Sequence, residues 1–277
     1  MKVSVILPTY NRAKLLKSSL ESLINLHPDE IIIINDSTDD TENVINELKS
    51  KINLKINLKI ITHKKRVGSA KARNEAIKEA EGDLLFFTDD DHIYPDSTLL
   101  EKIKRIFTDN PIIGAIVLKE YKKGKKSTKV TFKKRFLMML TEWIILELFQ
   151  QKRGYVKYGS SAMIVKRSIM NRIKYDEGYI RNCWREESQL QLDIQKLNWK
   201  IYFDPSLYFQ HIYVDYGGYR TISREKYHYW TIRNHTRFLK KNFPWKILPF
   251  FLLFLQANIR KGRAKEFIKA FKDGLKS

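Results

Sequence analysis

The first half of the chain alternates two hydrophobic periods, one typical of buried strands and one of amphipathic helices. Short apolar runs occur at Val3–Leu7, Ile31–Asp36 and Leu58–Thr62, and a fourth, LLFFT, begins at Leu84. Between these runs the apolar residues recur every three or four positions, as they do from Leu15 to Leu23. Strands that alternate with helices predict βαβ units and a buried parallel sheet.

The same alternation continues through the remaining elements that the pattern predicts. These are helices over Thr41–Lys49, Ser69–Ala80, Leu99–Phe107 and Glu187–Leu197, an amphipathic stretch over Phe136–Phe149, and strands over Ile112–Leu118, Ser161–Lys166 and Lys200–Phe203, the last ended by Asp204-Pro205. No low-complexity linker interrupts the pattern. We therefore expect one α/β domain over residues 1–215, followed by a distinct basic and aromatic tail over residues 216–277.

The charge of the chain is strong and unevenly distributed. The 277 residues are 43% hydrophobic and 30% charged, which is typical of a globular protein, and carry a formal net charge of +21. Lys119–Arg135 contributes +8 and Arg220–Ser277 contributes +12, so the rest is nearly neutral. A localised basic surface indicates either an anionic partner (a membrane, a phosphorylated substrate or nucleic acid) or simply a solvated, lysine-rich face.

Cysteine content and apolar run lengths indicate where the protein works. Cys183 is the single cysteine, which excludes an internal disulfide and fits a reducing compartment. The opening MKVSVILP is typical of a strand and not of a signal peptide. The longest apolar run of the tail, Ile247–Leu255, is far shorter than the ~20 residues that a membrane span needs. We expect a cytoplasmic protein whose tail either packs on the main domain or lies peripherally on the inner face of the membrane.

Polar residues follow the predicted strands at the points where ligands of parallel sheets bind. PTYNR (Pro8–Arg12) follows the first strand, NDSTDDT (Asn35–Thr41) the second and TDDDH (Thr88–His92) the fourth, while RVGSAKARNEA (Arg66–Ala76) opens the third helix. Each piece alone has an ordinary explanation as a helix cap or a turn. Together they offer carboxylates, backbone donors and cations at one edge, which suits a nucleotide, its phosphates and a divalent ion such as Mg²⁺ or Mn²⁺.

Four separated blocks of the sequence resemble, in the same order, the blocks of glycosyltransferase family 2. They are VSVILPTYNR, INDSTDDT, GSAKARNEAIKEAEGDLLFFTDDD and REESQLQLDIQKLNWKIYFDP, and the resemblance spans about residues 2–211. It implies a GT-A fold, which is a Rossmann-like, mostly parallel α/β sheet flanked by helices, here with a basic helical C-terminal extension. Residues 1–118 would form the nucleotide-binding half and 119–215 the acceptor-binding half. Such enzymes transfer a sugar from a nucleoside-diphosphate donor with inversion at the anomeric carbon.

The resemblance also implies roles for individual residues on the donor side. The nucleoside pocket would be lined by Pro8, Thr9, Tyr10 and Arg12. Asp36 would hydrogen-bond the base, usually uracil, Arg73 would lie near the diphosphate, and Asp89 would meet the ribose. The metal would be held principally by Asp90, with Asp91 as the second choice and His211 as a further ligand. His92 is expected on a helix surface or in a cap.

On the acceptor side, the resemblance implies that Glu187 takes the proton of the attacking hydroxyl, with Glu186 as its alternative. Tyr158, Gly159 and Ser160 would shape the acceptor pocket. The sequence departs from the family pattern at two points: Asn35 stands where many relatives have Asp, and the pair Glu186-Glu187 stands where Glu-Asp is common. The second departure gives the base one extra methylene.

Two other functions compete with metal-assisted sugar transfer. A nucleotidyltransferase that makes nucleotide sugars would show a glycine-rich loop after the first strand, and PTYNRAKLL contains no glycine. A non-catalytic nucleic-acid-binding protein is favoured only by the charge. We therefore expect a nucleotide-sugar donor, a glycan or polyprenyl-lipid-linked acceptor, an anionic membrane surface bound through residues 220–277, and no nucleic acid.

Overall fold

The computed structural model describes residues 1–49, 56–121, 131–143, 152–214, 217–218 and 222–277. The strands are β1 Val3–Thr9, β2 Glu30–Asn35, β3 Asn57–Thr62, β4 Leu84–Phe87, β5 His92–Ile93, β6 Ile113–Tyr121, β7 Gly154–Tyr155, β8 Met163–Lys166 and β9 Lys200–His211. The helices are α1 Ala13–Ile24, α2 Thr41–Lys49, α3 Ser69–Glu79, α4 Leu99–Asp109, α5 Phe132–Thr141, α6 Arg167–Met170, α7 Glu186–Lys196, α8 Arg224–Asn242, the 3₁₀ helix η2 Pro244–Lys246, α9 Ile247–Ile259 and α10 Ala264–Lys276.

The described strands form one sheet whose first half is parallel. The strand order is β3-β2-β1-β4-β8-β6-β9-β5, and β7 pairs with β9 beside this path. In the parallel half Thr9 lies beside Asn35, and Asn35 lies beside Thr62. These strands therefore end level with one another, so the polar residues that follow them gather at a single edge.

The second half of the sheet is mixed. Strand β8 is antiparallel to β4 and β6, and β5 is antiparallel to β9, which places His92 opposite His211. The expectation that the last strand ends at Asp204-Pro205 is wrong, because β9 continues to His211. Its pairing with β6 shifts register between Val117 and Lys119, so Pro205 lies in an irregular part of the ladder, where a missing N–H is tolerated.

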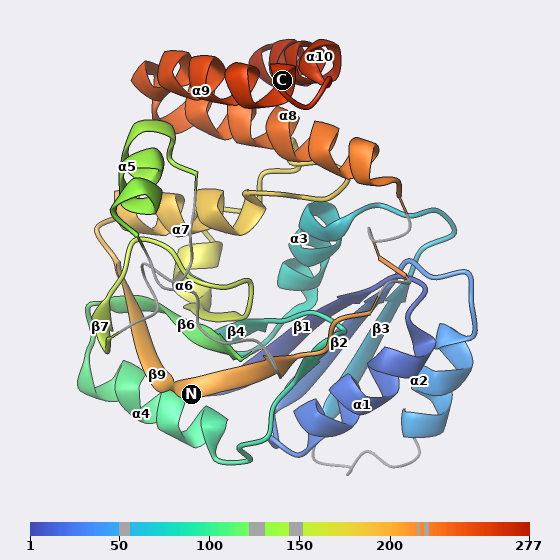
Figure 1. Cartoon of the computed structure of the whole chain (residues 1–277). Coiled ribbons are helices and arrows are strands. Elements are labelled where there is room, and N and C mark those ends of the chain that lie inside the picture. Colours follow the sequence, from blue (N-terminus) through green and yellow to red (C-terminus); the bar gives the residue numbers. More distant parts are fainter. Residues whose placement is uncertain (50–55, 122–130, 144–151, 215–216, 219–221) are drawn as a thin grey trace.

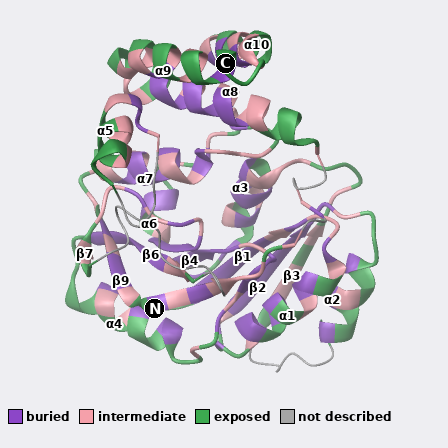
Figure 2. Cartoon of the chain, viewed as in Figure 1, coloured by how far each residue is buried: buried purple, intermediate pink, exposed green. Residues whose placement is uncertain are grey.

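Helices cover both faces of the sheet because its strands are apolar on both sides. Val5 and Leu7 belong to a core with α1, α2 and α4, whereas Ile6, between them, belongs to a core with α3, α6 and α7. Figure 1 shows the sheet between these two helical layers, and Figure 2 shows that its strands are mostly buried. The alternation predicted from sequence is thus the packing pattern of a three-layer α/β domain.

The C-terminal helices form a third core with the main domain. Ile232, Phe238 and Leu239 of α8 are fully buried, and their cluster includes Tyr158 and Leu192 from the main domain. Helices α9 and α10 complete this cap above α7 and α8 (Figure 1). Of the two arrangements expected for the tail, packing on the main domain is therefore present.

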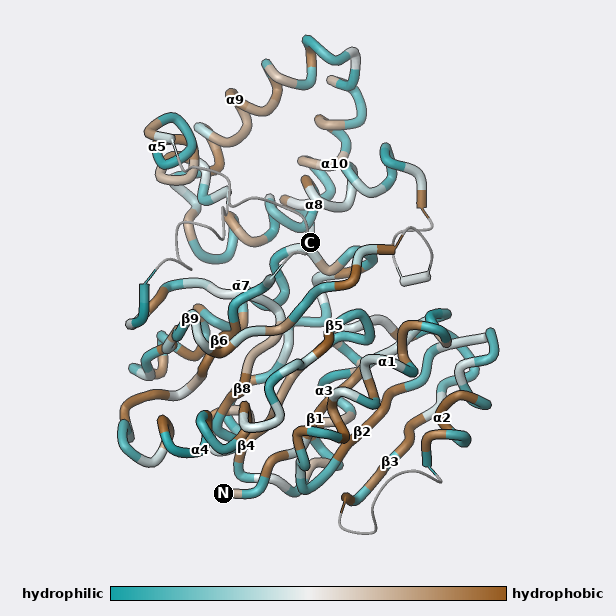
Figure 3. The backbone as a smooth tube through the Cα atoms, turned by 60° about the horizontal axis from the view of Figure 1, so that its bottom comes forward, coloured by the Kyte–Doolittle hydropathy of each residue, from teal (hydrophilic) through white to brown (hydrophobic). Residues whose placement is uncertain are grey.

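Helices α5 and α9 lie next to each other, and α9 is rich in hydrophobic residues along its length (Figure 3). Helix α5 begins at Phe132, four residues before the predicted amphipathic stretch, whose residues 144–149 lie outside the described part, as do residues 122–130 of the first basic segment. Within the described ranges, no helix is both long and apolar enough to cross a membrane.

We expect Phe238→Ala to destabilise the whole chain. The substitution leaves a cavity in the third core and removes the ring over which the Arg185 guanidinium lies, 3.7 Å from its centroid. The free energy of unfolding should fall by about 3–5 kcal/mol, measured by urea denaturation with circular dichroism. Leu252→Ala, at a site 56% exposed on α9, is the matched control and should change it by less than about 0.5 kcal/mol. If both variants lowered the free energy of unfolding by similarly small amounts, the tail would fold independently of the main domain.

Candidate active site

One cavity lies at the edge where the parallel strands end. Its volume is about 460 Å³. It is lined by every residue that the sequence predicts for the site except one: Pro8, Thr9, Tyr10, Arg12, Asp36, Arg73, Asp89, Asp90, Asp91, Gly159, Ser160, Glu186, Glu187 and His211. The exception is Tyr158. The structure therefore brings together residues that are up to two hundred positions apart in the chain.

A buried arginine, Arg73 of α3, holds the acidic groups at the centre of this cavity. Its side chain is 1% exposed, and Nη2 donates to Asp89 Oδ1 at 2.7 Å. Nη1 donates to Glu186 and lies 3.7 Å from Glu187 Oε1. Although burial opposes its charge, these carboxylates raise the pKa of Arg73 well above its ordinary value. The guanidinium thus lies among three acids, Asp89 from the loop after β4 and Glu186 and Glu187 from α7.

A second arginine, Arg12, bridges two of the consecutive aspartates. Its Nη1 donates to Asp90 Oδ1 at 2.6 Å and to Asp91 Oδ2 at 2.9 Å. The hydroxyl of Thr9 donates to the other Asp90 oxygen at 2.8 Å. Burial raises the pKa of Asp90 to about 6, although Arg12 opposes the shift. Both oxygens of Asp90 thus have partners within the protein, and Arg12 faces these acids.

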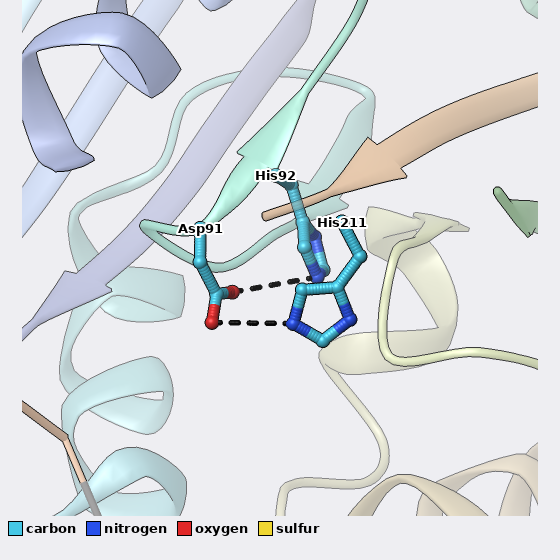
Figure 4. Close-up of side chains that lie close together, drawn as sticks. All are labelled: Asp91, His92 and His211. Carbon is cyan, nitrogen blue, oxygen red and sulfur yellow. Dashed lines mark ion pairs between the residues drawn. The ribbon is translucent and has the colours of Figure 1, made fainter. Parts of the chain in front are cut away.

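Asp91, His92 and His211 form a cluster that suits a metal ion (Figure 4). One ligand atom from each lies within 4.8 Å of the others, and His211 Nε2 is 3.2 Å from Asp91 Oδ2. Behind this cluster, His211 Nδ1 lies 2.5 Å from Glu120 Oε1. Burial lowers the pKa of His211, but its bonds to Asp91 and Glu120 outweigh burial and raise it to about 9.

The donor atoms of this cluster fit a divalent cation. A carboxylate and two imidazoles suit Mn²⁺ and related transition metals, and a carboxylate behind a ligating histidine orients the ring. Two of the predicted ligands, Asp91 and His211, are thereby brought together. The expectation for His92 is wrong: it lies in β5, 2% exposed, because the pairing of β5 with β9 turns its ring toward His211.

The two glutamates at the start of α7 differ in their surroundings. Glu186 is 1% exposed and accepts a hydrogen bond from Ser69 Oγ at 2.8 Å, besides its bond from Arg73. The side chain of Glu187 is 25% exposed and lines the cavity. Burial and the neighbouring charge of Glu186 raise the pKa of Glu187 to about 8. A carboxylate with a pKa near the working pH, open to a ligand, is suited to act as a general base.

The segment that precedes these glutamates has an unusual backbone. Arg181, Cys183 and Arg185 all have φ between +50° and +81°. Such left-handed conformations are unfavourable for non-glycine residues and are found disproportionately at functional sites. Residues 181–185 therefore form a strained segment that leads directly into Glu186.

The opposite end of the cavity is built around Asp36. Its Oδ2 accepts the backbone N–H groups of Val67 at 3.0 Å and Gly68 at 3.2 Å, and Oδ1 lies 2.8 Å from His63 Nδ1. Gly68 has φ +90°, which a side chain would disfavour, and it caps α3. Asp36 thus fixes the loop before α3 while it lines the cavity.

Two of the three residues expected to contact the acceptor line the cavity. Gly159 packs against Val117 so closely that a Cβ atom would overlap its side chain, and Ser160 Oγ donates to the Leu118 carbonyl at 2.6 Å. Tyr158 is 1% exposed and belongs to the third core, where its hydroxyl donates to Glu142 at 2.8 Å.

Several lining residues were not singled out from the sequence. They are Arg181, Trp184, Tyr227 and Glu120, while Arg66, Ser69 and His92 lie in motifs for which the sequence predicted no contact of their own with the site. The Arg66 guanidinium lies 4.0 Å from the Tyr10 ring centroid. Its place in the RVGSAK motif is the one sequence feature that indicates a position near the site. Trp184 and Tyr227 lie in segments without a strand-end pattern, so nothing in the sequence pointed to them.

Comparison with known proteins identifies a family. The model of glycosyl transferase family 2 matches residues 4–179. A dolichyl N-acetyl-alpha-D-glucosaminyl phosphate 3-beta-D-2,3-diacetamido-2,3-dideoxy-beta-D-glucuronosyltransferase of Methanococcus voltae is 30% identical over 218 residues, 74% of this chain and 65% of that protein. The poly(ribitol-phosphate) beta-N-acetylglucosaminyltransferase TarS of Staphylococcus aureus is 36% identical over 104 residues, 36% of this chain and 18% of that protein. The chain thus spans at most about two thirds of these relatives.

Solved structures share the fold. TarS residues 1–349 in complex with UDP-GlcNAc superpose with a TM-score of 0.68 and 18% identity over 99% of this chain and 80% of that one. The mannosyltransferase PcManGT of Pyrobaculum calidifontis, in complex with GDP-Man and Mn²⁺, gives 0.64 and 17% identity over 97% and 73%. The predicted GT-A fold with a helical C-terminal part is confirmed.

The raised pKa of Glu187 predicts how a substitution changes stability with pH. The folded chain retains a proton that the unfolded chain releases near pH 4.5, so stability is lost as the pH rises from about 4.5 toward 8. Glu187→Gln removes this loss. Its melting temperature should exceed that of the wild type by about 2–4 °C at pH 8 and by little at pH 5, measured by calorimetry.

Glu186→Gln is the matched control for this prediction. It removes a charged partner of the buried Arg73 and should lower the melting temperature at pH 8. A Glu187→Gln gain that is equal at both pH values would contradict the raised pKa.

Proposed function

The chain belongs to glycosyltransferase family 2, and we propose that it transfers a sugar from a nucleoside-diphosphate donor to a hydroxyl of a glycan or lipid-linked acceptor, with inversion. The observation that carries this proposal is the gathering of acids, arginines and histidines from the segments after β1 and β4 and from α3, β5, α7 and β9 around one cavity. The named substrates of the relatives support it: UDP-GlcNAc in TarS and a dolichyl-linked phosphate sugar in the Methanococcus enzyme.

The donor nucleoside binds between Tyr10 and Asp36. The Tyr10 ring, with Arg66 above it, offers a stacking surface, and Pro8 and Thr9 complete the wall. Asp36 keeps lone pairs beyond its three bonds and can accept an N–H of the base. A UDP-sugar is the first choice of donor, as the resemblance to the family implies.

Asp91 and His211 hold a divalent ion, with His92 beside them and Glu120 orienting His211. Such an ion stabilises negative charge on a leaving diphosphate. Two imidazoles favour Mn²⁺ over Mg²⁺, which prefers oxygen ligands. Asp90 holds Arg12 beside the Asp91–His92–His211 cluster and does not bind the ion itself. Arg73 and Asp89 form the neighbouring wall toward the diphosphate.

Glu187 acts as the general base, and Glu186 holds Arg73 and Ser69 in place. In the reaction the acceptor oxygen forms a bond to the anomeric carbon, its proton passes to Glu187, and the bond from that carbon to the diphosphate oxygen breaks. In the free enzyme the ionised form of Glu187 is disfavoured, as its raised pKa shows. The ionised carboxylate therefore has a high affinity for the proton that the attacking hydroxyl releases. Gly159 and Ser160 bound the acceptor side.

Helices α5 and α9 dock the enzyme on an anionic membrane surface. Their exposed apolar residues, which we call the α5–α9 face, are Phe132, Phe136, Met139, Leu248, Leu252 and Leu253. Phe132 and Phe136 stack with ring centroids 6.3 Å apart. Lysines of the basic tail, whose net charge is +12, supply attraction to acidic lipids. This places the active site near a lipid-linked acceptor.

Donor and metal binding test the proposal directly. In a thermal-shift screen of UDP-, GDP- and dTDP-sugars, one class should raise the melting temperature, and Mn²⁺ should increase that rise. Asp91→Asn should abolish the Mn²⁺-dependent part, because it removes the one carboxylate of the cluster. Lys265→Gln on α10 is the control and should leave both effects unchanged. Absence of any nucleotide-sugar effect would refute donor binding.

Turnover tests the base. Glu187→Gln should lower kcat by about 10²–10⁴-fold while the donor-induced thermal shift persists, because the amide cannot take a proton. Wild-type turnover in this variant would remove Glu187 from the role.

Vesicle binding tests the α5–α9 face. Leu248→Glu with Leu252→Glu should abolish flotation with phosphatidylglycerol vesicles, because both side chains are more than half exposed and would carry charge into the interface. Deleting residues 220–277 is unsuitable, because α8 is part of the third core. Lys272→Glu, on α10, adds the same charge outside the face and should float more strongly than the leucine variant. Equal flotation of all three proteins would exclude the face.

A further inference from the structure

A second cavity adjoins the active site on the side of the C-terminal helices. Its volume is about 550 Å³. It is lined by Trp143, Trp184, Arg224, Tyr227, His228, Thr231, Lys261 and Arg263. Trp184 and Tyr227 line both cavities, so the two share a wall. A ligand held in the second cavity would thus lie next to the first.

The lining of the second cavity is positively charged. Three of its side chains, Arg224, Lys261 and Arg263, are cations, and none of its described lining residues is a carboxylate. Within the part of the chain that the structure describes, none of these three forms an ion pair. Glu225 lies nearby: hydrogen bonds from its own backbone N–H and from Ser223, with the charges of Arg263 and Arg224, lower its pKa, so one negative charge offsets part of the three positive ones.

Two helix N-termini add to this positive potential. Helix α8 begins at Arg224, and Arg263 is the N-cap of α10. Helices α8 and α10 run in the same direction, because contacts late in one helix meet residues late in the other. Gly274 packs against Arg233, and the Lys240 ammonium donates to the Leu275 carbonyl at 2.6 Å. Each N-terminus carries about half a positive charge, although at α8 the Ser223 side chain already accepts the N–H of Lys226. Both ends face the cavity that their first residues line.

An aromatic wall stands opposite the cations. Trp143 and Trp184 have ring centroids 5.8 Å apart, and Trp143 packs on Phe254 of α9 at 4.7 Å. The buried Nε1 of Trp184 has no hydrogen-bond acceptor among the described residues. Such a donor costs free energy when it is left unpaired, so a ligand oxygen there would be favourable. Flat rings beside an anion site suit a sugar ring or an isoprenoid group next to a phosphate.

We propose that the second cavity binds a phosphoryl group of the acceptor substrate, so that the adjoining sugar or apolar group lies on Trp143 and Trp184. This inference rests on the proposed function. Trp184 lies three residues before Glu187, so an acceptor anchored there can extend its hydroxyl toward the proposed base. None of the proposed donor residues, such as Asp36, lines the second cavity, and its shared wall includes Trp184 close to Glu187, so we assign it to the acceptor. The shared chemistry is a phosphate ester, borne either by a lipid or by a polyol.

The test compares two triple variants of equal charge. One carries Arg224→Gln, Lys261→Gln and Arg263→Gln, and the control carries Lys265→Gln, Lys269→Gln and Lys272→Gln, three exposed lysines of α10. Binding of geranyl phosphate, glycerol 3-phosphate, inorganic phosphate and geraniol is followed by tryptophan fluorescence. The cavity triple should bind the phosphate esters at least about tenfold more weakly than wild type, and the control within about twofold.

Two further arms make the outcomes decisive. Tighter binding of geranyl phosphate than of glycerol 3-phosphate indicates a lipid-linked acceptor, and the reverse indicates a polyol phosphate. Trp184→Phe should remove most of the fluorescence change. Trp199→Phe should not, because Trp199 packs against the core formed with α3, α6 and α7. Equal weakening in both triples, or geraniol binding as tightly as geranyl phosphate, would overturn the proposal.

The proposed function is checked separately by the donor-induced thermal shift. Loss of donor binding with intact phosphate-ester binding would refute sugar transfer and leave the anion site standing. An intact donor shift without any phosphate-ester binding would refute the anion site alone.

Discussion

The site depends on two buried arginines that allow its carboxylates to lie close together. Arg73 is 1% exposed, and removing one partner of such a buried charge costs about 3–5 kcal/mol. Its partners come from the end of β4 and the start of α7, so the pairing joins both to α3. Arg12 does the same for Asp90 and Asp91. The three consecutive aspartates can therefore lie side by side because Asp89 faces Arg73, whereas Asp90 and Asp91 share Arg12.

This pairing separates structural acids from reactive ones. Asp90 and Glu186 accept hydrogen bonds inside the protein, although burial raises the pKa of both, whereas Glu187 is open to the cavity and carries a pKa raised to about 8. Asp91 shares Arg12 with Asp90 but also faces two histidines. A group whose charge is incompletely compensated costs stability and keeps reactivity, which is the usual arrangement at catalytic sites.

Local patterns predicted the first half of the fold and most of the cavity. A continuous apolar run, as around Ile6, indicates a strand buried on both faces, and level strand ends follow from parallel pairing. Long-range pairing carries no such local signal. His92 meets His211 only because β5 lies antiparallel beside β9, and Tyr158 turns inward only because α8 covers it. The contacts of Arg12 with Asp90 and Asp91 likewise join residues that are far apart in the chain, which spacing does not encode.

The C-terminal helices also hold the segment that carries the proposed base. Residues 181–185 contain three strained non-glycine residues, and such strain persists only where the surroundings fix it. Helix α8 supplies that restraint: Asn182 Nδ2 donates to Thr231 Oγ1 at 2.8 Å, and Asn234 Nδ2 donates to the Ile180 carbonyl at 3.0 Å and to Asn182 Oδ1 at 3.1 Å. Because Glu186 follows this segment directly, α8 sets the position of both glutamates. The basic tail therefore positions the proposed base and also forms part of the wall of the second cavity.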